Sequence, residues 1–369
     1  MNHDRASQTL FELLGMRKPI VQAPMAGVAT PALAAAVSEA GGLGSLGVGA
    51  MSAEQAREAI RQTRALSRAP FNVNVFCHAP ARRDAAVEQR WLNWLQPRFA
   101  ELGAEPPSSL REIYRSFVDD QAMQQLLLDE RPAVVSFHFG LPGADVVAEL
   151  KRAGIRLMAS VTNPDEARRA VDAGVDVLVA QGIEAGGHRG VFDPDAPDEG
   201  LGVFALTRLL VRRFDTPVVA AGGIMDGAGI AAVLALGAQA AQLGTAFVAC
   251  AESSADSRYR AALLGEPARH TVLTAAISGR PARSLLNRHA ELERASDRPR
   301  VPDYPLAYDA ARALHAAAVA AGVSGYGAQW AGQGAAMARA LPAGELVATL
   351  EAELADALRP WRALQPGRR

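Results

Sequence analysis

The sequence predicts an α/β fold: a closed (β/α)8 barrel (TIM barrel) with a helical insertion and a C-terminal helical subdomain. Eight short β-rich runs alternate with alanine-rich helical patterns, which is typical of a parallel sheet covered by helices. Hydrophobic residues make up 49% of the chain and aromatic residues only 5%, so the interior must consist of Ala, Val, Leu and Ile, as in layered barrels. The eight runs favour a closed barrel over an open, doubly wound sheet.

The expected strands are separated by segments long enough to hold a helix. They lie at Pro19–Met25, Leu43–Val48, Phe71–Phe76, Ala133–Phe139, Arg156–Val161, Val177–Gln181, Pro217–Ala221 and Ala240–Thr245. The expected helices lie at Pro31–Glu39, Ala53–Leu66, Gly143–Ala153, Asp165–Ala173, Val203–Phe214 and Asp226–Leu236.

Two segments do not fit this repeat. Residues 77–130 are polar and carry two tryptophans, so we expect a helical insertion after the third strand. Residues 265–369 contain further helical patterns and form either a lid or a small second subdomain. We therefore expect a barrel domain over residues 1–264 and a C-terminal helical segment over residues 265–369.

Composition excludes several classes of protein. The 38 basic and 39 acidic residues leave a formal charge of −1, with no excess of positive charge for nucleic acid and no basic amphipathic stretch for a membrane surface. The first residues lack the apolar core of a signal peptide. Cys77 and Cys250 cannot form a disulfide framework or a CxxC metal site. We expect a soluble, cytoplasmic enzyme.

A barrel places its active site where its strands end, so the seventh and eighth strands suggest a phosphate site. They end in Ala221-Gly222-Gly223-Ile224 and Leu243-Gly244-Thr245-Ala246, and a helix begins after Gly223 with Asp226 near its cap. Glycines allow close approach of a ligand, and free N–H groups at a helix start favour a phosphate. Two tight turns without a ligand would give the same pattern; a sugar phosphate and flavin mononucleotide (FMN) would each fit.

The third strand weakly favours a heteroaromatic ligand. In Phe71–Phe76, alternation places Asn72 and Asn74 on one face. Their amides need partners inside a barrel, and either a ring with alternating donors and acceptors or an internal hydrogen-bond network would satisfy them. Gln181 could match the pyrimidine edge of a flavin. The GxGxxG pattern at residues 42–47 lies on a strand and follows a helix, so we interpret it as close packing and not as a dinucleotide site.

Histidine and tyrosine side chains supply the remaining candidates. His138 and His188 are the histidines at expected strand ends beside glycines, where each could act as a base, a donor or, when protonated, a cationic anchor. They form no metal site, because no third ligand has a useful spacing. If Pro305 opens a helix, Tyr304, Tyr308 and Arg312 share one face, either as an exposed cap or as a lid for an anionic substrate.

Several motifs in order resemble the class I nitronate monooxygenases of bacteria. They are PIVQAPMAGVATPALAAAVSEAGGLGSLG at residues 19–47, FNVNVF at 71–76, VSFHFG at 135–140, QGIEAGGHRG at 181–190, YPLAYDAAR at 304–312 and WAGQG at 330–334. The resemblance extends from about residue 19 to 334.

The resemblance implies a noncovalent FMN enzyme that oxidises alkyl nitronates with O2, through an anionic flavosemiquinone, to a carbonyl product and nitrite. It implies propionate 3-nitronate as the physiological substrate. The residues that it implies for FMN are Met25, Gly27, Asn74, Gln181, Gly186, Gly222, Gly223, Gly244, Thr245 and Gln333. It implies His138 and His188 as catalytic residues, and Tyr304, Tyr308 and Arg312 as substrate-binding residues.

For two residues, the role that the resemblance implies cannot be transferred directly. The family is expected to have lysine where this chain has Arg312, and arginine presents a planar fork that could bind a carboxylate or face solvent. A nitronate is already deprotonated, so His188 is more simply a group that orients the substrate or balances its charge than a base.

Three other functions remain open from sequence. An NAD(P)H-dependent quinone or enoyl reductase would use the same barrel and FMN. A sugar-phosphate isomerase or aldolase would be colourless, and the strand ends offer no obvious catalytic lysine or carboxylate pair for it. A flavin-binding protein without turnover is the third.

Overall fold

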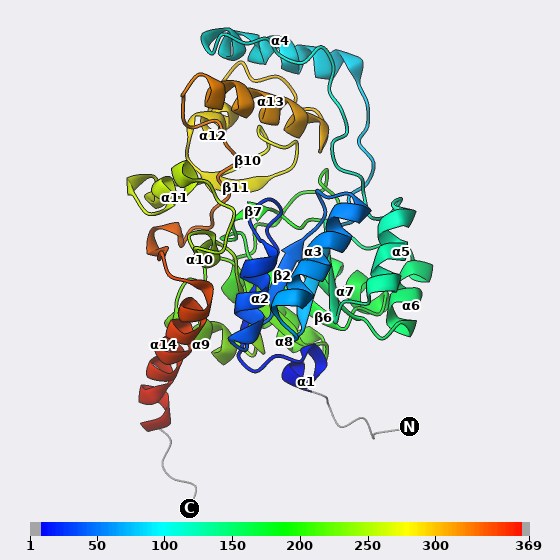
Figure 1. The fold of residues 1–369 in the computed structure, drawn as a ribbon, viewed down its shortest axis with the longest axis vertical. Helices are drawn as coiled ribbons and strands as arrows, with labels where there is room; N and C mark the ends of the chain where they lie inside the picture. Colours follow the sequence, from blue (N-terminus) through cyan, green and yellow to red (C-terminus); the bar gives the residue numbers. More distant parts are fainter. Residues whose placement is uncertain (1–8, 364–369) are drawn as a thin grey trace, which may run out of the picture.

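The computed structural model describes residues 9–363 and contains the expected barrel. Eight parallel strands form one sheet in the order β1-β9-β8-β6-β5-β4-β3-β2, and a parallel bridge between Val21 and Leu43 joins the two ends of this order (Figure 1). The strands are β1 (Ile20–Gln22), β2 (Gly44–Gly47), β3 (Phe71–Phe76), β4 (Val134–His138), β5 (Arg156–Val161), β6 (Val177–Gln181), β8 (Val218–Ala221) and β9 (Ala240–Leu243). The predicted fold class is confirmed.

Helices surround this sheet, and side-chain caps set where several of them begin. The outer helices are α2 (Pro31–Glu39), α3 (Ala53–Leu66), α5 (Gln121–Glu130), α6 (Ala144–Arg152), α7 (Pro164–Asp172), α8 (Val203–Arg213), α9 (Gly227–Ala235) and α14 (Ala343–Ala363). Thr30, Ser52 and Asn163 each accept a backbone N–H of the first turn, which satisfies donors that a helix start would otherwise leave free. The six helices expected from sequence are present, with ends displaced by one residue at most.

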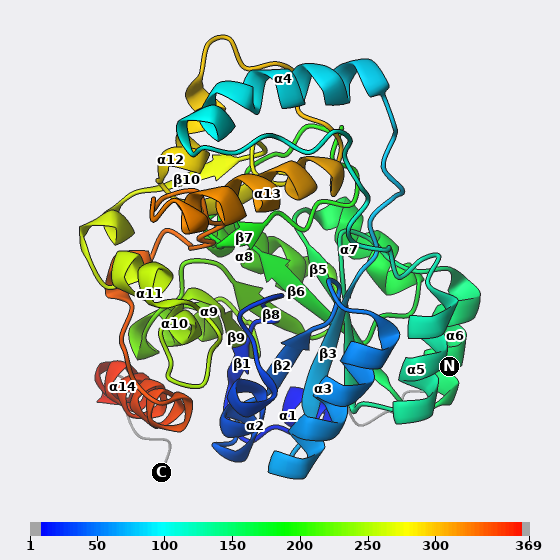
Figure 2. The same cartoon turned by 45° about the horizontal axis from the view of Figure 1, so that its top comes forward.

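The two helices within residues 77–130 lie in different layers of the molecule, and the last helix of the chain belongs to the outer layer of the barrel. Helix α5 packs between α3 and α6, on the outside of the barrel. Helix α4 (Ala85–Glu101) instead lies beyond the barrel against α13 (Leu306–Ala320), as Figure 2 shows. Helix α14 packs against both α9 and α2 and so occupies the outer layer after β9.

A three-stranded antiparallel sheet, which the sequence patterns did not predict, joins the barrel to the C-terminal segment. It pairs β10 (Thr271–Thr274) with β11 (Ala282–Leu285), and β11 with β7 (Gly187–His188). The remaining short helices are α1 (Leu10–Leu14), α10 (Thr245–Val248), α11 (Ser257–Leu263), α12 (Arg288–Glu291), η1 (Glu266–Arg269), η2 (Leu292–Arg294) and η3 (Ala335–Met337). This small sheet places β7 and its histidine under the C-terminal segment.

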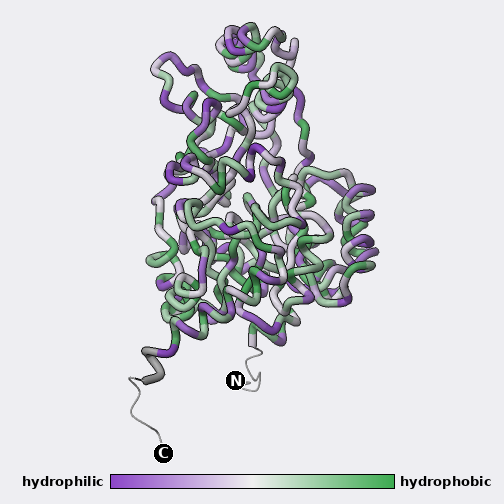
Figure 3. Tube along the Cα trace, turned by 60° about the vertical axis from the view of Figure 1, so that its left-hand side comes forward, coloured by the Kyte–Doolittle hydropathy of each residue, from purple (hydrophilic) through white to green (hydrophobic). Residues whose placement is uncertain are grey.

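The apolar core lies inside the barrel and between the strands and helices, and Figure 3 shows hydrophobic segments there and hydrophilic ones toward the periphery. Gly44 of the GxGxxG pattern lies on β2, where an added Cβ would be 1.9 Å from the carbonyl oxygen of Ala34 in α2. Close helix–strand packing is therefore the role of this glycine, as expected. Across residues 9–363, no helix combines the length and the apolar character needed to cross a membrane.

Candidate active site

A cavity of about 950 Å³ opens at the carboxyl ends of the barrel strands. All but one of the residues expected in the site line it: Met25, Gly27, Asn74, His138, Gln181, Gly186, His188, Gly222, Gly223, Gly244, Thr245, Tyr304, Tyr308 and Arg312. The exception is Gln333, whose side chain is exposed and whose backbone N–H donates to the carbonyl of Glu184 over 2.9 Å. Residues distant in sequence thus meet in one cavity.

Three loops and the segment before η3 form a glycine-lined wall of this cavity. Gly222 and Gly223 adopt positive φ angles of 131° and 68°, which side chains other than glycine rarely adopt. The backbone N–H of Gly332 donates to Oγ1 of Thr245 over 3.0 Å, and an added Cβ on Gly186 would lie 2.5 Å from the nitrogen of Gly332. This part of the cavity is therefore lined by closely packed backbone and not by side chains.

The start of α9 already has its own anionic partners. Asp226 is the N-cap, as expected, and accepts the N–H of Gly229 over 2.8 Å. Glu353 of α14 accepts the N–H of Gly227 over 3.0 Å. A phosphate in the cavity would thus meet the glycine loops that precede α9 and not these two donors of its first turn.

The two asparagines of β3 face the barrel interior together, as alternation predicted. Both donate to Oγ of Ser136 over 2.9 Å, and Asn72 also donates to Oγ of Ser45 over 3.2 Å. Asn72 is buried in this internal network, whereas Asn74 also lines the cavity. The internal network thus satisfies the amide nitrogen of Asn72, whose Oδ1 has no partner, and Asn74 is the one of the two that lines the cavity.

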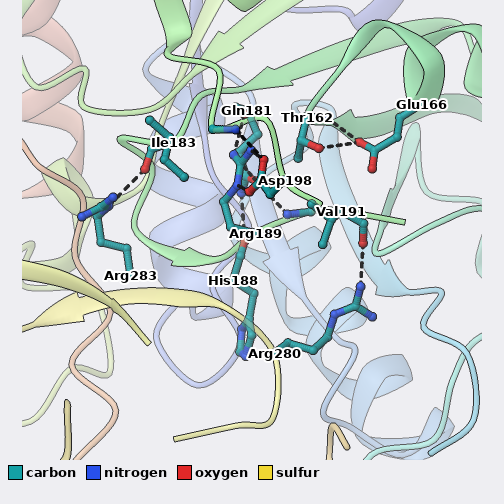
Figure 4. Close-up of polar contacts among 12 residues, drawn as sticks. Thr162, Glu166, Gln181, Ile183, His188, Arg189, Val191, Asp198, Arg280 and Arg283 are labelled. Carbon is teal, nitrogen blue, oxygen red and sulfur yellow. Dashed lines mark hydrogen bonds and ion pairs between the residues drawn. The ribbon is translucent and has the colours of Figure 1, made fainter. Parts of the chain in front are cut away.

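Gln181 at the end of β6 holds the turn that carries His188. Its Nε2 donates to the His188 carbonyl over 2.9 Å, and its Oε1 accepts the N–H of Gly190 over 2.7 Å. Arg189 is 1% exposed, pairs with Asp198 over 2.7 Å and donates to the Gln181 carbonyl over 2.8 Å (Figure 4). These bonds fix the backbone on both sides of the histidine.

His188 lies among aromatic rings at the centre of the cavity. Its ring centroid lies 5.0 Å from that of Trp330 and 5.5 Å from those of Phe139 and Tyr304. Its Nε2 is 2.9 Å from Oγ of Ser278. Burial, followed by the nearby His138 and Arg280, lowers the pKa of His188 to about 3. The imidazole is therefore neutral near pH 7 and acts as a hydrogen-bonding group or base, not as a standing cation.

His138, at the end of β4, supports His188 through the backbone. Its Nε2 lies 3.2 Å from the His188 carbonyl, which can only accept, so the neutral ring carries its proton on Nε2. Burial lowers the pKa of His138 to about 4. Both candidate catalytic histidines are thus uncharged at neutral pH.

Helix α13 presents the predicted face to the cavity, with Pro305 at its N-cap. Tyr304 is buried, Tyr308 is half-buried and Arg312 is exposed at the outer end. Burial raises the pKa of both phenols, so Tyr304 and Tyr308 remain protonated donors. Arg312 also lies close enough to Tyr114 to oppose the upward shift of that tyrosine's pKa.

Sequence reasoning missed four residues around His188. Tyr114 and Trp330 line the cavity, and Ser278 and Arg280 lie behind it. Tyr114 comes from residues 77–130, with its ring centroid 5.6 Å from that of Tyr308. Ser278 and Arg280 lie in the connection between β10 and β11, which shows no helical or strand period. Only the pairing of β11 with β7 brings that connection to His188.

These features define a class of protein: a (β/α)8-barrel enzyme whose ligand cavity combines a glycine-lined wall with neutral histidines and protonated phenols. Comparison with known proteins then identifies the family. The family model described as nitronate monooxygenase matches residues 7–353. Nitronate monooxygenase from Paraburkholderia phytofirmans is 65% identical over 362 residues, covering 98% of this chain and 99% of that protein. The one from Pseudomonas aeruginosa is 57% identical over 342 residues, covering 93% and 97%.

Solved structures agree with this assignment. A nitroalkane oxidase from Streptomyces ansochromogenes is 44% identical, with a TM-score of 0.87, and the match covers 94% of this chain and 98% of that one. FabK from Thermotoga maritima is 30% identical, with a TM-score of 0.74 and coverage of 96% and 98%. The chain belongs to the nitronate monooxygenase family and is an oxidoreductase.

Proposed function

We propose that this enzyme binds FMN noncovalently and uses O2 to oxidise small anionic nitronates, with propionate 3-nitronate as the substrate, to a carbonyl compound and nitrite. The observation that supports this best is the composition of the cavity. A glycine-lined wall at the ends of β8 and β9 faces a chamber with a neutral histidine and two phenol donors. Family membership supports the oxidation of nitronates.

The glycine-lined wall fits the phosphate of FMN. Gly222, Gly223, Gly244 and Thr245 would hold it, because side chains are absent where the two loops approach each other and helix α10 begins at Thr245. The cavity volume of about 950 Å³ leaves space for a substrate beside a flavin ring. The FMN, when bound, would supply the electron acceptor that passes electrons from nitronate to O2.

The polar residues that line the cavity fit the ring system. Asn74 of β3 and Gln181 of β6 both line the cavity, and Met25 and Gly27 line it from the loop after β1. The amide of Gln181 is already engaged by His188 and Gly190, which leaves one Nε2 hydrogen for a ligand. Gln333 would act through its backbone, since its N–H holds the loop of Glu184 and its side chain faces solvent.

The substrate needs orientation more than deprotonation. A nitronate has already lost the acidic α-proton of the nitroalkane, so the neutral His188 would hold one of its oxygens, and Tyr304 and Tyr308 would donate hydrogen bonds to the anion. Arg312, at the outer end of the same helix face, would meet the carboxylate of propionate 3-nitronate. His138 would keep His188 in place through its bond to the backbone.

Spectroscopy and kinetics test this proposal. We expect the purified protein to be yellow, to release FMN on denaturation, and to oxidise nitronates far faster than the matching neutral nitroalkanes. Little NAD(P)H should be consumed. Colourless protein that cannot be reconstituted with FMN would contradict the cofactor assignment. Comparable turnover of NADH with a quinone would assign the reductase activity instead.

A further inference from the structure

The turn of Ser278, Gly279 and Arg280 connects β10 to β11 directly behind the substrate chamber. Gly279 has φ 91°, and an added Cβ would lie 2.5 Å from the carbonyl oxygen of Pro302 and 2.6 Å from the nitrogen of Tyr304. Only glycine allows this contact. The turn is therefore packed against the residues that lead into Tyr304, while Ser278 contacts His188.

Arg280 is a buried charge on which Glu166, Asp193 and Asp195 act only from a distance. It is 3% exposed, and one guanidinium nitrogen donates to the carbonyl of Val191 over 2.6 Å, as Figure 4 shows. Its Nε has no hydrogen-bond partner, and no ion pair links it to an acidic side chain among residues 9–363. Burial lowers the pKa of Arg280 to about 10, so it keeps its charge at neutral pH. A buried charge that forms no ion pair costs stability.

Phe139 holds Arg280 beside the chamber. The guanidinium carbon lies 4.4 Å from the centroid of the Phe139 ring, which is a cation–π contact. The same ring meets His138 at 4.5 Å and His188 at 5.5 Å between centroids. Phe139 has φ 71°, a conformation that is strained for a residue other than glycine. The backbone is thus held in an unfavourable conformation at the residue that separates the arginine from the histidines.

We propose that Arg280 supplies the fixed positive charge of the substrate chamber, so that the turn that carries it selects anionic substrates. Arg280 does not line the cavity, and it acts across Phe139 as a positioning residue and not by touching the substrate. This inference deepens the proposed function and rests on it for the identity of the anion.

The turn of Arg280 also reaches the His188 ring through Ser278. The Ser278 Oγ lies 2.9 Å from Nε2 of His188 and 3.1 Å from the carbonyl oxygen of Arg280. The positive charge of Arg280 disfavours a second proton on the His188 ring, so the cation of this site is Arg280 and not His188.

The groups that face His188 from the elements packed against it carry no negative charge near pH 7. They are His78, His138, Arg280, Tyr304 and Tyr308. Removal of Arg280 would therefore remove the fixed charge and raise the pKa of His188. An anionic substrate would then bind without a fixed positive charge nearby, unless His188 took up a proton as the substrate bound.

The first measurement is the affinity of the full-length FMN-bound enzyme for propionate, by isothermal titration calorimetry at pH 7.5. We expect Arg280→Gln, which keeps a donor and loses the charge, to weaken binding by about tenfold or more, because the fixed positive charge that attracts the anion is lost. Arg280→Lys should recover most of the affinity. Arg269→Met is the matched control, since Arg269 is exposed, lies outside the cavity lining and loses the same charge; it should leave affinity unchanged.

The second measurement is the protonation of the His188 imidazole by ¹⁵N NMR against pH. Arg280→Gln should raise the pKa of His188 and Arg280→Lys should not, whereas Ser278→Ala, which keeps the charge of Arg280, should leave the affinity for propionate intact. Wild-type affinity and an unchanged His188 titration in Arg280→Gln would overturn the role of Arg280. An equal loss of propionate affinity in Ser278→Ala and in Arg280→Gln would overturn it as well, because Ser278→Ala keeps the charge of Arg280.

Neither measurement requires turnover of a nitronate, so a failure of the proposed substrate is distinguishable from a failure of this inference. Flavin content and thermal unfolding are checked for each variant. If Arg280→Gln does not fold, Arg280→Met replaces the charge by an apolar chain of similar length and carries the same expectation.

Discussion

At the scale of single residues, the protonation state of His188 decides what it can contribute. Burial and neighbouring cationic or neutral groups hold its pKa at about 3. A role in balancing charge, which the sequence left open, would therefore need a proton that arrives with the substrate. Orientation of the nitronate through a hydrogen bond needs none, and Ser278 and Gln181 hold the residue ready for it.

We predict that His188→Asn keeps its FMN but loses about tenfold to a hundredfold in kcat/KM on a nitronate, since one hydrogen bond to an anion contributes roughly 1.5–3 kcal/mol. The measurement compares one nitronate with its parent nitroalkane in wild type and variant. A variant that is defective only on the neutral nitroalkane would show that His188 is a base. A variant with wild-type values on both compounds would show that its role is structural.

At the scale of elements, close contacts between helix and strand depend on single glycines. Gly44 of β2 has no space for a Cβ, because the backbone of α2 occupies it. Gly344, near the start of α14, has no atom within 4 Å of its added Cβ. The two positions therefore test packing and helix propensity separately.

Gly44→Ala is expected to destabilise the protein by more than about 3 kcal/mol, because α2 must move away from the sheet. Gly344→Ala is expected to stabilise it by roughly 0.5–1 kcal/mol through helix propensity alone. Urea unfolding at pH 7 measures both. Equal effects of the two variants would contradict the contact between Gly44 and Ala34.

At the scale of the whole molecule, buried histidines connect stability to pH. Burial lowers the pKa of His78, His138 and His289 to about 4, and that of His188 to about 3. The unfolded chain takes up protons near pH 6.5 and the folded chain does not, so the unfolded state binds more protons between these values. Stability is therefore full above about pH 6.5 and is lost as the pH falls toward 4.

His289 isolates this effect from the active site, because it lies outside the cavity lining and its Nδ1 is 3.1 Å from the Tyr326 carbonyl. We predict that His289→Gln loses less free energy of unfolding than wild type between pH 7 and pH 5, by on the order of 2 kcal/mol. Urea titrations at the two pH values measure the difference. An identical pH dependence in both proteins would show that His289 titrates normally when folded.

Local patterns in the sequence were sufficient to predict the eight strands and the six helices, and the strand-end patterns together with the family resemblance predicted the lining of the cavity by all but one of the expected residues. The reason is that a parallel barrel brings all its strand ends to one mouth, so residues at those ends meet whatever their distance along the chain. Alternation likewise placed Asn72 and Asn74 on one face, although it could not show that the amide nitrogen of Asn72 finds its acceptors in Ser45 and Ser136.

Only the tertiary structure decided what surrounds His188. The pairing of β7 with β11 joins residues about a hundred positions apart over two register pairs, too short a match to leave a periodic pattern in the sequence. That pairing brings Ser278 and Arg280 to the histidine, and the resulting burial sets its charge. Composition and spacing determine which side chains reach the barrel mouth, whereas desolvation and long-range contacts determine their protonation, because both depend on neighbours that the local sequence does not contain.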